Sequence, residues 1–366
     1  MRSRYIIILL AAFLAFSIQA GVHAHIITVA PGESVKAAID SANVGDTIMV
    51  QNAIYRENLN ITKPLVLQGL GYPVLDAGGK GSAMYFLAEG ILLRGFKIIN
   101  ASAQGAGINV SNISSNNIIK YNMIEDNGGD GIDLWASANN SIEGNTIEDN
   151  GGNGIGLWSS ESSSISKNDI TENKGAGIFG GCSNGSIQEN NLISNGGSGM
   201  VLLNSFGNNI SQNRATENQE NGFMIIFSSD NRIAGNRAQN SSLSGISLLF
   251  SWQNTISDNA VLGNMVGMQL GNSSDENQIF DNSVISNRLG ISLGRSSQNA
   301  IYHNYLENNG YSNYDDGENQ WDDGNRGNFY LGWTCKDLNG DGICDSSLNV
   351  PGGTGVDRYP LATWSR

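Results

Sequence analysis

Apolar residues recur along this chain in short runs with a spacing of two, and the runs repeat every 22 or 23 residues. One unit places Ile142 and Ile147 ahead of Ile155 and Leu157. A spacing of two predicts short strands with one buried face, and the unit is too short for a helical hairpin. The isoleucine that opens each unit stands at Ile119, Ile142, Ile165, Ile187, Ile210, Ile233, Ile256, Ile279 and Ile301.

Asparagine forms two further columns in register with these isoleucines. Asparagine and glycine both tolerate positive φ, so they indicate sharp bends between the strands. Stacked asparagine side chains can hydrogen-bond along a column and to turn backbone, which predicts a structural role. One column is Asn122, Asn145, Asn168, Asn190, Asn213, Asn236, Asn259, Asn282 and Asn304. The other is Asn127, Asn150, Asn173, Asn195, Asn218, Asn264, Asn287 and Asn309, with Ser241 as its one gap.

Together the columns predict an all-β fold, a right-handed single-stranded parallel β-helix built from coils of 22 or 23 residues. No coil can bury its apolar face alone, so neighbouring coils must stack. With strands about 4.8 Å apart, the repeated coils predict a rod on the order of 45 Å long. Met200 and Met268 fall in the inward column and are expected to fill the core.

The remaining segments predict four parts of the chain. A basic start and a short apolar run indicate a secretory signal. Ser34 is expected to cap a short helix that covers the open end of the core. The parts are a signal peptide at 1–24, an N-terminal cap with the first coils at 25–72, repeats at 73–310 and an irregular C-terminal cap at 311–366.

The net charge and the distribution of apolar segments limit where this protein can act and what it can bind. The formal net charge is −14, which argues against nucleic acid as a partner. Outside the predicted signal no apolar segment is long enough to cross a membrane. We therefore expect a secreted or otherwise extracytoplasmic protein, at a cell surface or in a periplasm-like space.

Three motifs carry a resemblance to a known family. They are Gly32–Ile39, Gly45–Val50 and Tyr55–Leu59, and three C-terminal runs add to them: Asn319–Asp322, Gly327–Tyr330 and Asp357–Leu361. These segments resemble exported parallel β-helix proteins of the NosD-like group, within the pectin-lyase-like superfamily. The resemblance covers nearly all of the chain after the signal. It implies the β-helix fold, in a group that includes lyases, epimerases, copper-enzyme assembly factors and surface proteins.

A calcium-type loop stands near the C-terminus. Oxygen-bearing side chains at relative positions 1, 3, 5 and 9, with glycine at 6, match the start of a calcium-binding loop. The predicted ligands are Asp337, Asn339, Asp341, the carbonyl of Ile343, and Asp345. Position 12 holds Leu348 instead of glutamate, so Asp357 is considered as the missing ligand. The cysteines on either side, Cys335 and Cys344, are expected to form a disulfide.

An outward column of large apolar residues is the candidate ligand surface. The column lies at and just beside the position that follows the last inward residue of each coil. A side chain at that position should point to solvent. Contiguous exposed aromatic residues often mark binding, and aromatic rings suit the C–H faces of sugars. The alternative is that the C-terminal tail covers this column. The predicted ligand-binding residues are Trp135, Trp158, Phe227, Phe250 and Trp252.

The search for catalytic residues favours a protein that is not an enzyme, and no catalytic residue is assigned. An acidic stripe with Asp126, Asp149 and Glu172 is expected to be a solvated face. The motif Asp-Pro-His-Asp, which the resemblance would imply for an epimerase, is absent, as are the signatures of pectin hydrolases. The expected function is therefore non-catalytic binding or organisation of envelope or extracellular glycans. A calcium-dependent polysaccharide lyase or epimerase is the alternative, with Asp126, Asp149 and Glu172 as its acidic candidates.

A third reading is an accessory protein for copper-enzyme maturation, with envelope proteins as partners. Copper is not expected as a cofactor, because imidazole and thiol ligands are scarce: His23, His25 and His303 are the only histidines. Glycosylation is expected at surface sequons if the host modifies exported proteins. These sequons begin at Asn60, Asn100, Asn109, Asn112, Asn139, Asn184, Asn209, Asn240 and Asn272.

Overall fold

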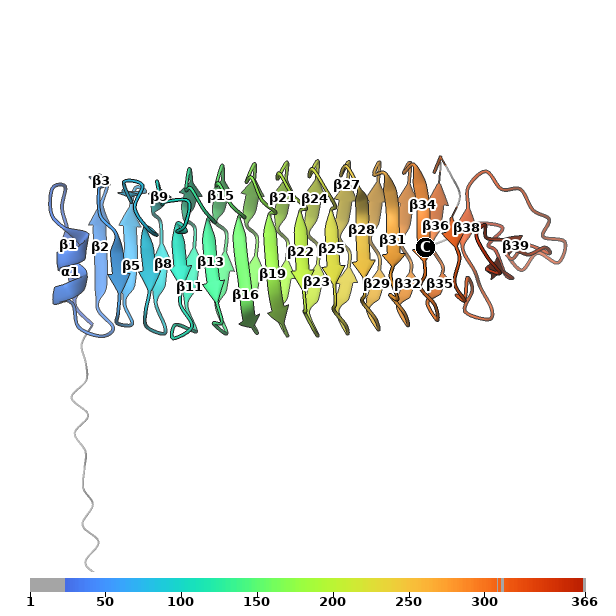
Figure 1. Cartoon of the computed structure of the whole chain (residues 1–366), viewed down its shortest axis with the longest axis horizontal. Helices are drawn as coiled ribbons and strands as arrows, with labels where there is room; N and C mark the ends of the chain where they lie inside the picture. Colours follow the sequence, from blue (N-terminus) through green and yellow to red (C-terminus); the bar gives the residue numbers. More distant parts are fainter. Residues whose placement is uncertain (1–23, 308, 311–312, 365–366) are drawn as a thin grey trace, which may run out of the picture.

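The chain folds into a straight rod of stacked coils, with a helix at one end and an irregular cap at the other (Figure 1). The structure is a computed structural model, and it describes residues 24–307, 309–310 and 313–364. The predicted signal peptide lies almost wholly outside these residues. A right-handed parallel β-helix, as predicted, is confirmed. Each coil contributes one strand to each of three sheets, which we call first, second and third in chain order.

The strands of each sheet are parallel and follow one another in coil order. The first sheet contains β1 (Ile26–Val29), β2 (Thr47–Gln51), β5 (Val66–Leu70), β8 (Leu92–Arg94), β11 (Ile118–Lys120), β14 (Ser141–Glu143), β17 (Ser164–Ser166), β20 (Ser186–Gln188), β23 (Asn209–Ser211), β26 (Arg232–Ala234), β29 (Thr255–Ser257), β32 (Gln278–Phe280) and β35 (Ala300–Tyr302). The second contains β3 (Ile54–Tyr55), β6 (Val74–Asp76), β9 (Lys97–Ile99), β12 (Met123–Glu125), β15 (Thr146–Glu148), β18 (Asp169–Thr171), β21 (Asn191–Ile193), β24 (Arg214–Thr216), β27 (Arg237–Gln239), β30 (Ala260–Leu262), β33 (Ser283–Ile285), β36 (Tyr305–Glu307) and β38 (Phe329–Tyr330).

The third sheet carries the surface discussed below. It contains β4 (Leu59–Ile61), β7 (Met84–Phe86), β10 (Ile108–Val110), β13 (Ile132–Trp135), β16 (Ile155–Glu161), β19 (Ile178–Ser183), β22 (Met200–Leu203), β25 (Phe223–Ile226), β28 (Ser244–Leu249), β31 (Val266–Gly271), β34 (Leu289–Gly294) and β37 (Tyr314–Asp315). With 13, 12 and 13 strands in the three sheets, the rod has more coils than the nine counted from the isoleucine column. The count of nine excluded the coils before Ile119, although residues 25–72 were predicted to hold the first of them, because their bends lack the asparagine that marks the later ones.

The core is one continuous column of inward side chains. The anchor isoleucines and the inward Met200 and Met268 have no exposed surface, as predicted. At the N-terminal end, α1 (Val35–Ser41) packs Val35 and Ile39 against this column. The Ser34 side chain accepts a hydrogen bond from the Ala37 amide at 3.0 Å, which is the predicted N-cap. Within the described part of the chain, no helix is both long and apolar enough to span a bilayer.

The asparagine columns form hydrogen-bonded ladders inside the bends. In a typical rung, the backbone and side-chain nitrogens of Asn213 both donate to Oδ1 of Asn236, at 2.9 and 3.0 Å. The same side-chain nitrogen also donates to the Ile187 carbonyl at 2.8 Å. Such a side chain therefore satisfies buried polar groups in the coils before and after its own, which confirms the structural reading. A third ladder, which the sequence analysis did not identify, runs through Asn208, Asn231, Asn254, Asn277, Asn299 and Asn319.

Two of the ladders end at buried aspartates in the C-terminal cap. Except at the Ser241 gap, the ladder asparagines donate toward the next coil. The residue that ends a ladder must therefore accept these hydrogen bonds and has no asparagine beyond it to which it could donate. Asp357 accepts from the backbone of Asn328 at 2.8 Å, and Asp315 accepts from the side chain of Asn319 at 2.7 Å. A carboxylate meets this requirement because it is acceptor-only.

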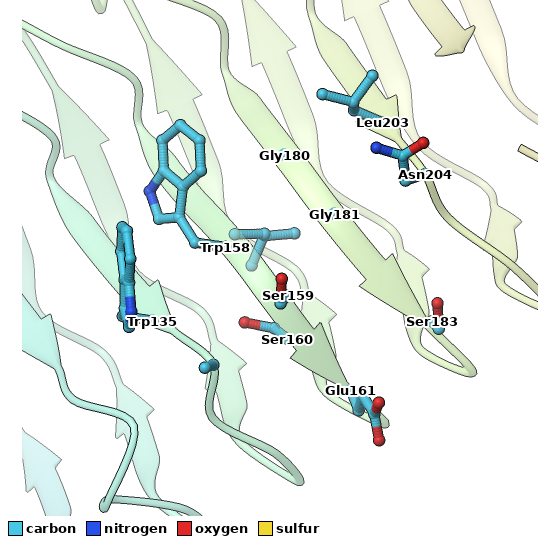
Figure 2. Close-up of a pocket in the computed structure, with 12 residues that line it drawn as sticks. Trp135, Trp158, Ser159, Ser160, Glu161, Gly180, Gly181, Ser183, Leu203 and Asn204 are labelled. Atoms are coloured by element: carbon cyan, nitrogen blue, oxygen red, sulfur yellow. The ribbon is translucent and has the colours of Figure 1, made fainter. Parts of the chain in front are cut away.

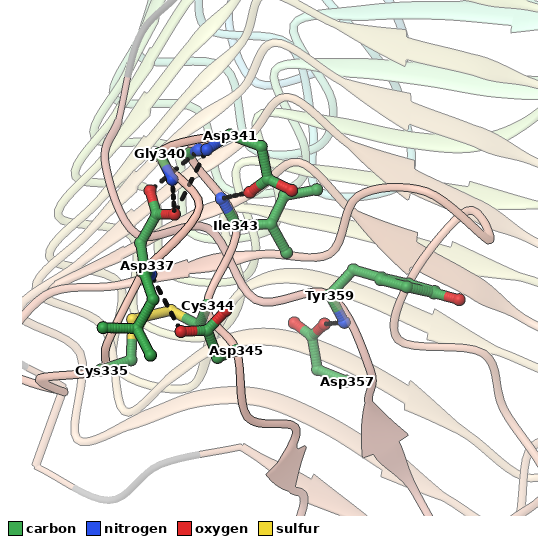
Figure 3. The surroundings of a disulfide bond; sticks show 11 residues. Cys335, Asp337, Gly340, Asp341, Ile343, Cys344, Asp345, Asp357 and Tyr359 are labelled. Atoms are coloured by element: carbon green, nitrogen blue, oxygen red, sulfur yellow. Dashed lines mark hydrogen bonds between the residues drawn. A yellow bond between two sulfur atoms is a disulfide. The ribbon is translucent and has the colours of Figure 1, made fainter.

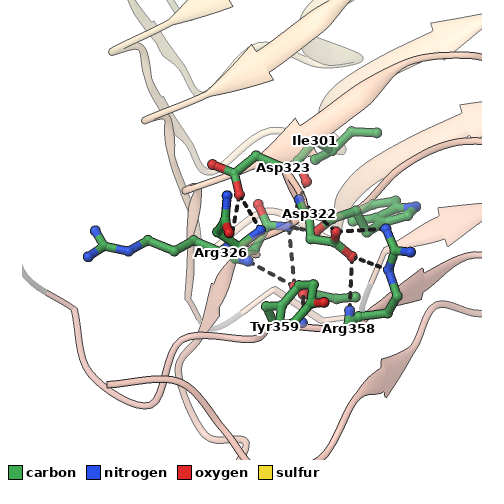
Figure 4. A network of polar contacts seen from close by, with 11 residues as sticks. Ile301, Asp322, Asp323, Arg326, Arg358 and Tyr359 are labelled. Atoms are coloured by element: carbon green, nitrogen blue, oxygen red, sulfur yellow. Dashed lines mark hydrogen bonds and ion pairs between the residues drawn. The ribbon is translucent and has the colours of Figure 1, made fainter. Parts of the chain in front are cut away.

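Trp321 closes the C-terminal end of the core. Its side chain is fully buried, and the indole nitrogen donates to Asp315 at 2.8 Å. Next to it the guanidinium of Arg358 holds both oxygens of Asp322, at 2.8 and 2.9 Å (Figure 4). A short antiparallel pair, β39 (Leu348–Asn349) and β40 (Val356–Asp357), completes the cap. These contacts anchor the last segment of the chain across the end of the rod.

Candidate functional site

Two carboxyl groups stand on the outer face of the third sheet. Asp133 points outward because its neighbours in β13, Ile132 and Leu134, point into the core. Asp130 lies in the bend that leads into the same strand. Both side chains are partly buried although they belong to the outer surface.

These carboxyl groups converge over a glycine of the next coil. Asp133 is paired in register with Gly156 of β16. A Cβ atom built on Gly156 would lie 2.5 Å from Oδ2 of Asp130, 3.1 Å from Oδ1 of Asp133 and 3.2 Å from Nε1 of Trp158. Any side chain at this position would therefore collide with the polar groups. The missing side chain leaves a small space onto which three polar atoms from two coils are directed.

The hydrogen bonds around the pair are incomplete. Oδ1 of Asp130 accepts from the backbone and side-chain nitrogens of Asn153, at 2.6 and 3.2 Å. Oδ2 of Asp133 accepts from the side chain of Asn109 at 3.2 Å. Oδ1 of Asp133 is buried and has no hydrogen-bond partner among the described residues. Because an unpaired buried acceptor is costly, this atom is suited to carry a proton or to bind a ligand.

Burial raises the pKa of Asp133 to about 6, and the nearby charge of Asp130 contributes in the same direction. Contacts with Trp158 and Asn109 oppose this shift in part. Burial also raises the pKa of Asp130, against the hydrogen bonds from Asn153. Two carboxyl groups this close do not ionise independently. Near pH 6 the pair can hold one proton next to one negative charge, as acid–base catalysis requires.

Aromatic side chains flank the carboxyl pair. The rings of Trp135 and Trp158 have centroids 6.0 Å apart, and Phe179 follows Trp158 at 5.7 Å. Trp135 is 54% exposed and Trp158 37% exposed. They border a shallow pocket of about 400 Å³, which Figure 2 shows. Gly180 and Gly181 of β19 line this pocket beside Trp158. Leu203 and Asn204, at the end of β22, line it on the far side of these glycines.

The other predicted ligand-binding residues are also at the surface. Phe227, Phe250 and Trp252 are each more than two-fifths exposed. The described part of the C-terminal cap lies at the end of the rod (Figure 1), so the alternative that the tail covers this column is wrong. Exposure is thus as predicted, while ligand binding at these residues remains a prediction.

The acidic candidates chosen from the sequence lie elsewhere. Asp126, Asp149 and Glu172 occupy exposed turns at φ of 53°, 54° and 56°, where the chain leaves the second sheet. The residues that do converge, Asp130 and Asp133, were missed. One signal could have found them: the coil with Asp130 and Asp133 has carboxylates at two positions that the next coil fills with Asn153 and Gly156.

Thermal stability is expected to fall as the pH rises from about 4 to 7. Burial raises the pKa of both Asp133 and Asp357 to about 6, above the ordinary value of 3.8. Their contribution to stability is therefore fully present below 3.8 and is lost as the pH rises through 6. Melting curves at stepped pH would test this. A melting temperature that rose steadily over this interval would contradict it.

The calcium-type loop adopts a turn held by its own aspartates (Figure 3). The carboxylate of Asp337 accepts from the amides of Gly340 at 2.8 Å and Gly342 at 3.0 Å. Cys335 and Cys344 form a disulfide that closes the loop. Asp357 does not reach it, because this side chain is buried at the end of its asparagine ladder. The idea that Asp357 supplies the missing ligand is therefore wrong.

Calcium binding at this loop remains a prediction. Among the described residues no three His, Cys, Asp or Glu side chains are gathered to hold a metal ion. We expect millimolar calcium to raise the melting temperature of the protein, since a ligand at ten times its Kd adds about 1.4 kcal/mol. Asp341→Ala should abolish that rise, whereas Asp126→Ala should retain it. An equal calcium response in both variants would locate the ion elsewhere.

Among the described residues, the histidine and cysteine side chains that could bind copper are not gathered at one place. His25 is at the first strand, beside Asp46, and His303 is near the last coil, 3.3 Å from Asp281. Cys182 is buried in the core, and burial raises its pKa to about 11. The two other cysteines are joined in the disulfide. These residues do not fit a copper site built on imidazole and thiolate.

Several solved structures share this fold. The A-module of mannuronan C-5 epimerase AlgE4 from Azotobacter vinelandii superposes with a TM-score of 0.69 at 16% identity, covering 78% of this chain and 94% of that one. The catalytic unit of a GH87 α-1,3-glucanase from Streptomyces thermodiastaticus gives 0.57 at 13% identity, with 82% and 69% covered. The receptor-binding domain of the siphovirus 9NA tailspike gives 0.56 at 11% identity, with 88% and 79% covered. No curated protein sequence matches the chain.

The expectation that this protein is not an enzyme is corrected by these structures. Two of the three are an epimerase and a glucanase, so the shared fold is one that carries catalytic sites. The expectation failed because it relied on short motifs. In this fold, polar groups from different coils meet on one face, as Asp130 and Asp133 meet Trp158 over Gly156.

A family model also matches the chain, over residues 39–196 and 152–335. The model describes a periplasmic copper-binding protein, NosD. The two matched segments overlap and together cover most of the coils, from α1 to the C-terminal cap. By this match, and as its terminal motifs predicted, the chain belongs to the NosD family.

Proposed function

We propose that this protein binds a neutral polysaccharide outside the cytoplasm and cleaves it by acid–base chemistry on the third sheet. The observation that carries the proposal is the convergence of Asp130, Asp133 and the Trp158 indole over Gly156. The epimerase and the glucanase that share the fold favour a role on carbohydrate. The periplasmic description of the family favours a location outside the cytoplasm.

The two carboxyl groups take different roles in the proposed reaction. Asp133, with its raised pKa, donates its proton to the glycosidic oxygen as the bond to the anomeric carbon breaks. Asp130 stays ionised, stabilises the positive charge that develops on the sugar, and accepts the proton of the attacking water. One chain end gains the hydroxyl of water and the other gains the proton of Asp133, so atoms and charge balance.

The aromatic residues supply binding and orientation. The exposed rings of Trp135 and Trp158 stand next to the carboxyl pair and can stack on the apolar face of a sugar. A neutral chain is favoured over a polyuronate because the site presents two carboxyl groups and the whole protein carries a formal charge of −14. A uronate would bring further negative charge next to Asp130.

The test uses residues 25–366 on a panel of neutral and acidic polysaccharides, with calcium or with chelator. Binding is followed by affinity electrophoresis, and products are followed as new reducing ends and as unsaturated ends. Reducing ends from a neutral glycan, without unsaturated ends, are expected. Unsaturated ends from a polyuronate would show a lyase instead. Absence of any product from the whole panel would overturn the proposed cleavage.

Matched variants assign the activity to this face. Trp135→Ala combined with Trp158→Ala should weaken glycan binding by at least tenfold, since stacking of a ligand ring on one aromatic side chain is worth roughly 1–3 kcal/mol. Tyr121→Ala is the control, because Tyr121 is an exposed aromatic of similar accessibility at a different bend of the rod. Equal losses in both variants would argue against a specific site.

A further inference from the structure

Two phenylalanines occupy an unusual backbone conformation beside the third sheet. Phe227 and Phe250 follow β25 and β28 with φ of 50° and 51°. Other coils place small or polar residues at this bend, among them Ala136, Ser159 and Asn204. A bulky side chain in the left-handed region is strained. Folding alone does not explain the aromatic choice, because asparagine adopts this conformation at lower cost.

The two rings form an exposed stack. Their centroids are 4.8 Å apart and their planes differ by 15°. The rings come from adjacent coils, which are also about 4.8 Å apart, so they stack along the rod axis. Phe227 is 45% exposed and Phe250 41% exposed, so the stack buries little surface. Such a patch on a monomer surface is a candidate contact for a ligand.

An apolar lane connects this stack with the pocket beside Trp158. Leu203, which lines the pocket, pairs in register with Ile226, and Ile226 pairs with Leu249. One face of the Phe227 ring is covered by Phe250. Its other face is directed back along the rod, toward the coil of Asn204, which also lines the pocket. The pocket therefore extends from Trp135 to Leu203 and Asn204, one coil before Phe227.

We propose that the Phe227–Phe250 stack is a second carbohydrate subsite, for a distant unit of the chain that is cleaved at Asp130 and Asp133. The inference rests on the proposed function. Trp158 and Phe227 are separated by three coils, from β16 to β25, or roughly 14 Å along the rod. That span holds several sugar units. The substrate class is therefore a long, unbranched polysaccharide that lies parallel to the rod and is cut internally.

A continuous glycan suits this surface better than a protein partner. The lane runs from Trp135 and Trp158, across Gly180 and Gly181, through Leu203 to Phe227 and Phe250, and a linear chain would contact all of it at once. The lane is narrow, because it contains only the last outward residue of each strand and the bend that follows. The residue just before that outward residue points into the core.

The decisive variant replaces both phenylalanines, Phe227→Asn with Phe250→Asn. Asparagine is favoured at positive φ, so this variant should melt no lower than the wild type, and any loss of binding cannot be assigned to misfolding. Substrates are size-fractionated fragments of the polysaccharide that the wild type cleaves. We expect KM to rise at least tenfold for long fragments, with little change for the shortest ones that are cut. Tyr121→Ala is the matched control.

Each outcome separates the two proposals. A rise in KM that is equal for short and long fragments, or no rise at all, would overturn the second subsite while the cleavage site stands. If the wild type cleaves nothing, affinity electrophoresis on intact polysaccharides decides. Retardation that depends on Phe227 and Phe250 would then support the subsite without the chemistry. Retardation that is absent, or that persists in the double variant, would overturn it.

Discussion

Replacing Asp133 by asparagine is expected to lower the rate of polysaccharide cleavage by roughly 10²- to 10⁴-fold, because the proton donor of the reaction is removed. The amide keeps the size of the carboxyl group and can still contact Asn109 and Trp158. Glycan binding should therefore change much less than turnover. The measurement is the rate of appearance of reducing ends at saturating glycan, together with binding by affinity electrophoresis.

The same substitution is expected to stabilise the protein at neutral pH. The pKa of Asp133 in the folded protein is about 6, above the ordinary 3.8, so folding becomes less favourable as this group ionises. The amide of the Asp133→Asn variant cannot ionise. Its gain at pH 7 should be about 2 kcal/mol once solvent screening is allowed for, which corresponds to a few degrees in melting temperature for a chain of this size. Below pH 4 the difference should vanish. A variant that is both more stable and inactive would identify Asp133 as a functional residue held at the expense of stability.

Asp126→Asn is the control for both effects. Asp126 is an exposed carboxylate in a neighbouring bend of the same coil. This change should leave turnover and the stability difference between pH 4 and 7 as in the wild type. Comparable losses of turnover for Asp126→Asn and Asp133→Asn would show that general surface charge, and not the converging pair, controls the reaction.

The largest loss of stability is expected from cutting an asparagine ladder in mid-rod, with Asn236→Ala. Oδ1 of Asn236 accepts both nitrogens of Asn213, and its own side-chain nitrogen donates to the Ile210 carbonyl at 2.8 Å and to Asn259 at 3.1 Å. The side chain is buried, so alanine would leave both nitrogens of Asn213 and the Ile210 carbonyl without these partners, and would remove one of the two donors to Asn259. Each unsatisfied buried group costs about 1–3 kcal/mol, which predicts a total loss of roughly 3–5 kcal/mol.

The gap at Ser241 offers the reciprocal experiment. Oγ of Ser241 is buried without a hydrogen-bond partner among the described residues, and the Asn264 side chain accepts from the Ser241 backbone at 2.9 Å. Ser241→Asn would complete this ladder between Asn218 and Asn264. It should raise the free energy of unfolding by about 1 kcal/mol, the net value of a typical hydrogen bond. Chemical denaturation measures both variants. We expect Asn236→Ala to lower the free energy of unfolding and Ser241→Asn to raise it. A lower free energy of unfolding for Ser241→Asn would show that the columns do not act as ladders.

Much of the fold could be predicted because it repeats. A buried isoleucine, a bend asparagine and a glycine return at the same interval, so each coil repeats the evidence of the last. The N-cap at Ser34 is also local, since it depends on residues three apart. The isoleucine count excluded the first coils, and the prediction did not include the ladder through Asn208 to Asn319. The first coils lack the bend asparagine, whereas the ladder residues from Asn208 to Asn299 recur every 22 or 23 residues and could have been found as a further column.

The sequence by itself determined the β-helix, the inward and outward faces of its strands and the exposure of Trp135 and Trp158, because all of these follow from the alternation of side chains along a strand. It did not determine which carboxylates meet. Asp126 and Asp133 are close in sequence, yet one lies in an exposed turn and the other faces Gly156 of the next coil. That difference depends on the register between coils and on one missing side chain. Tertiary structure alone decided the site, because stacking brings together residues that lie a full coil apart.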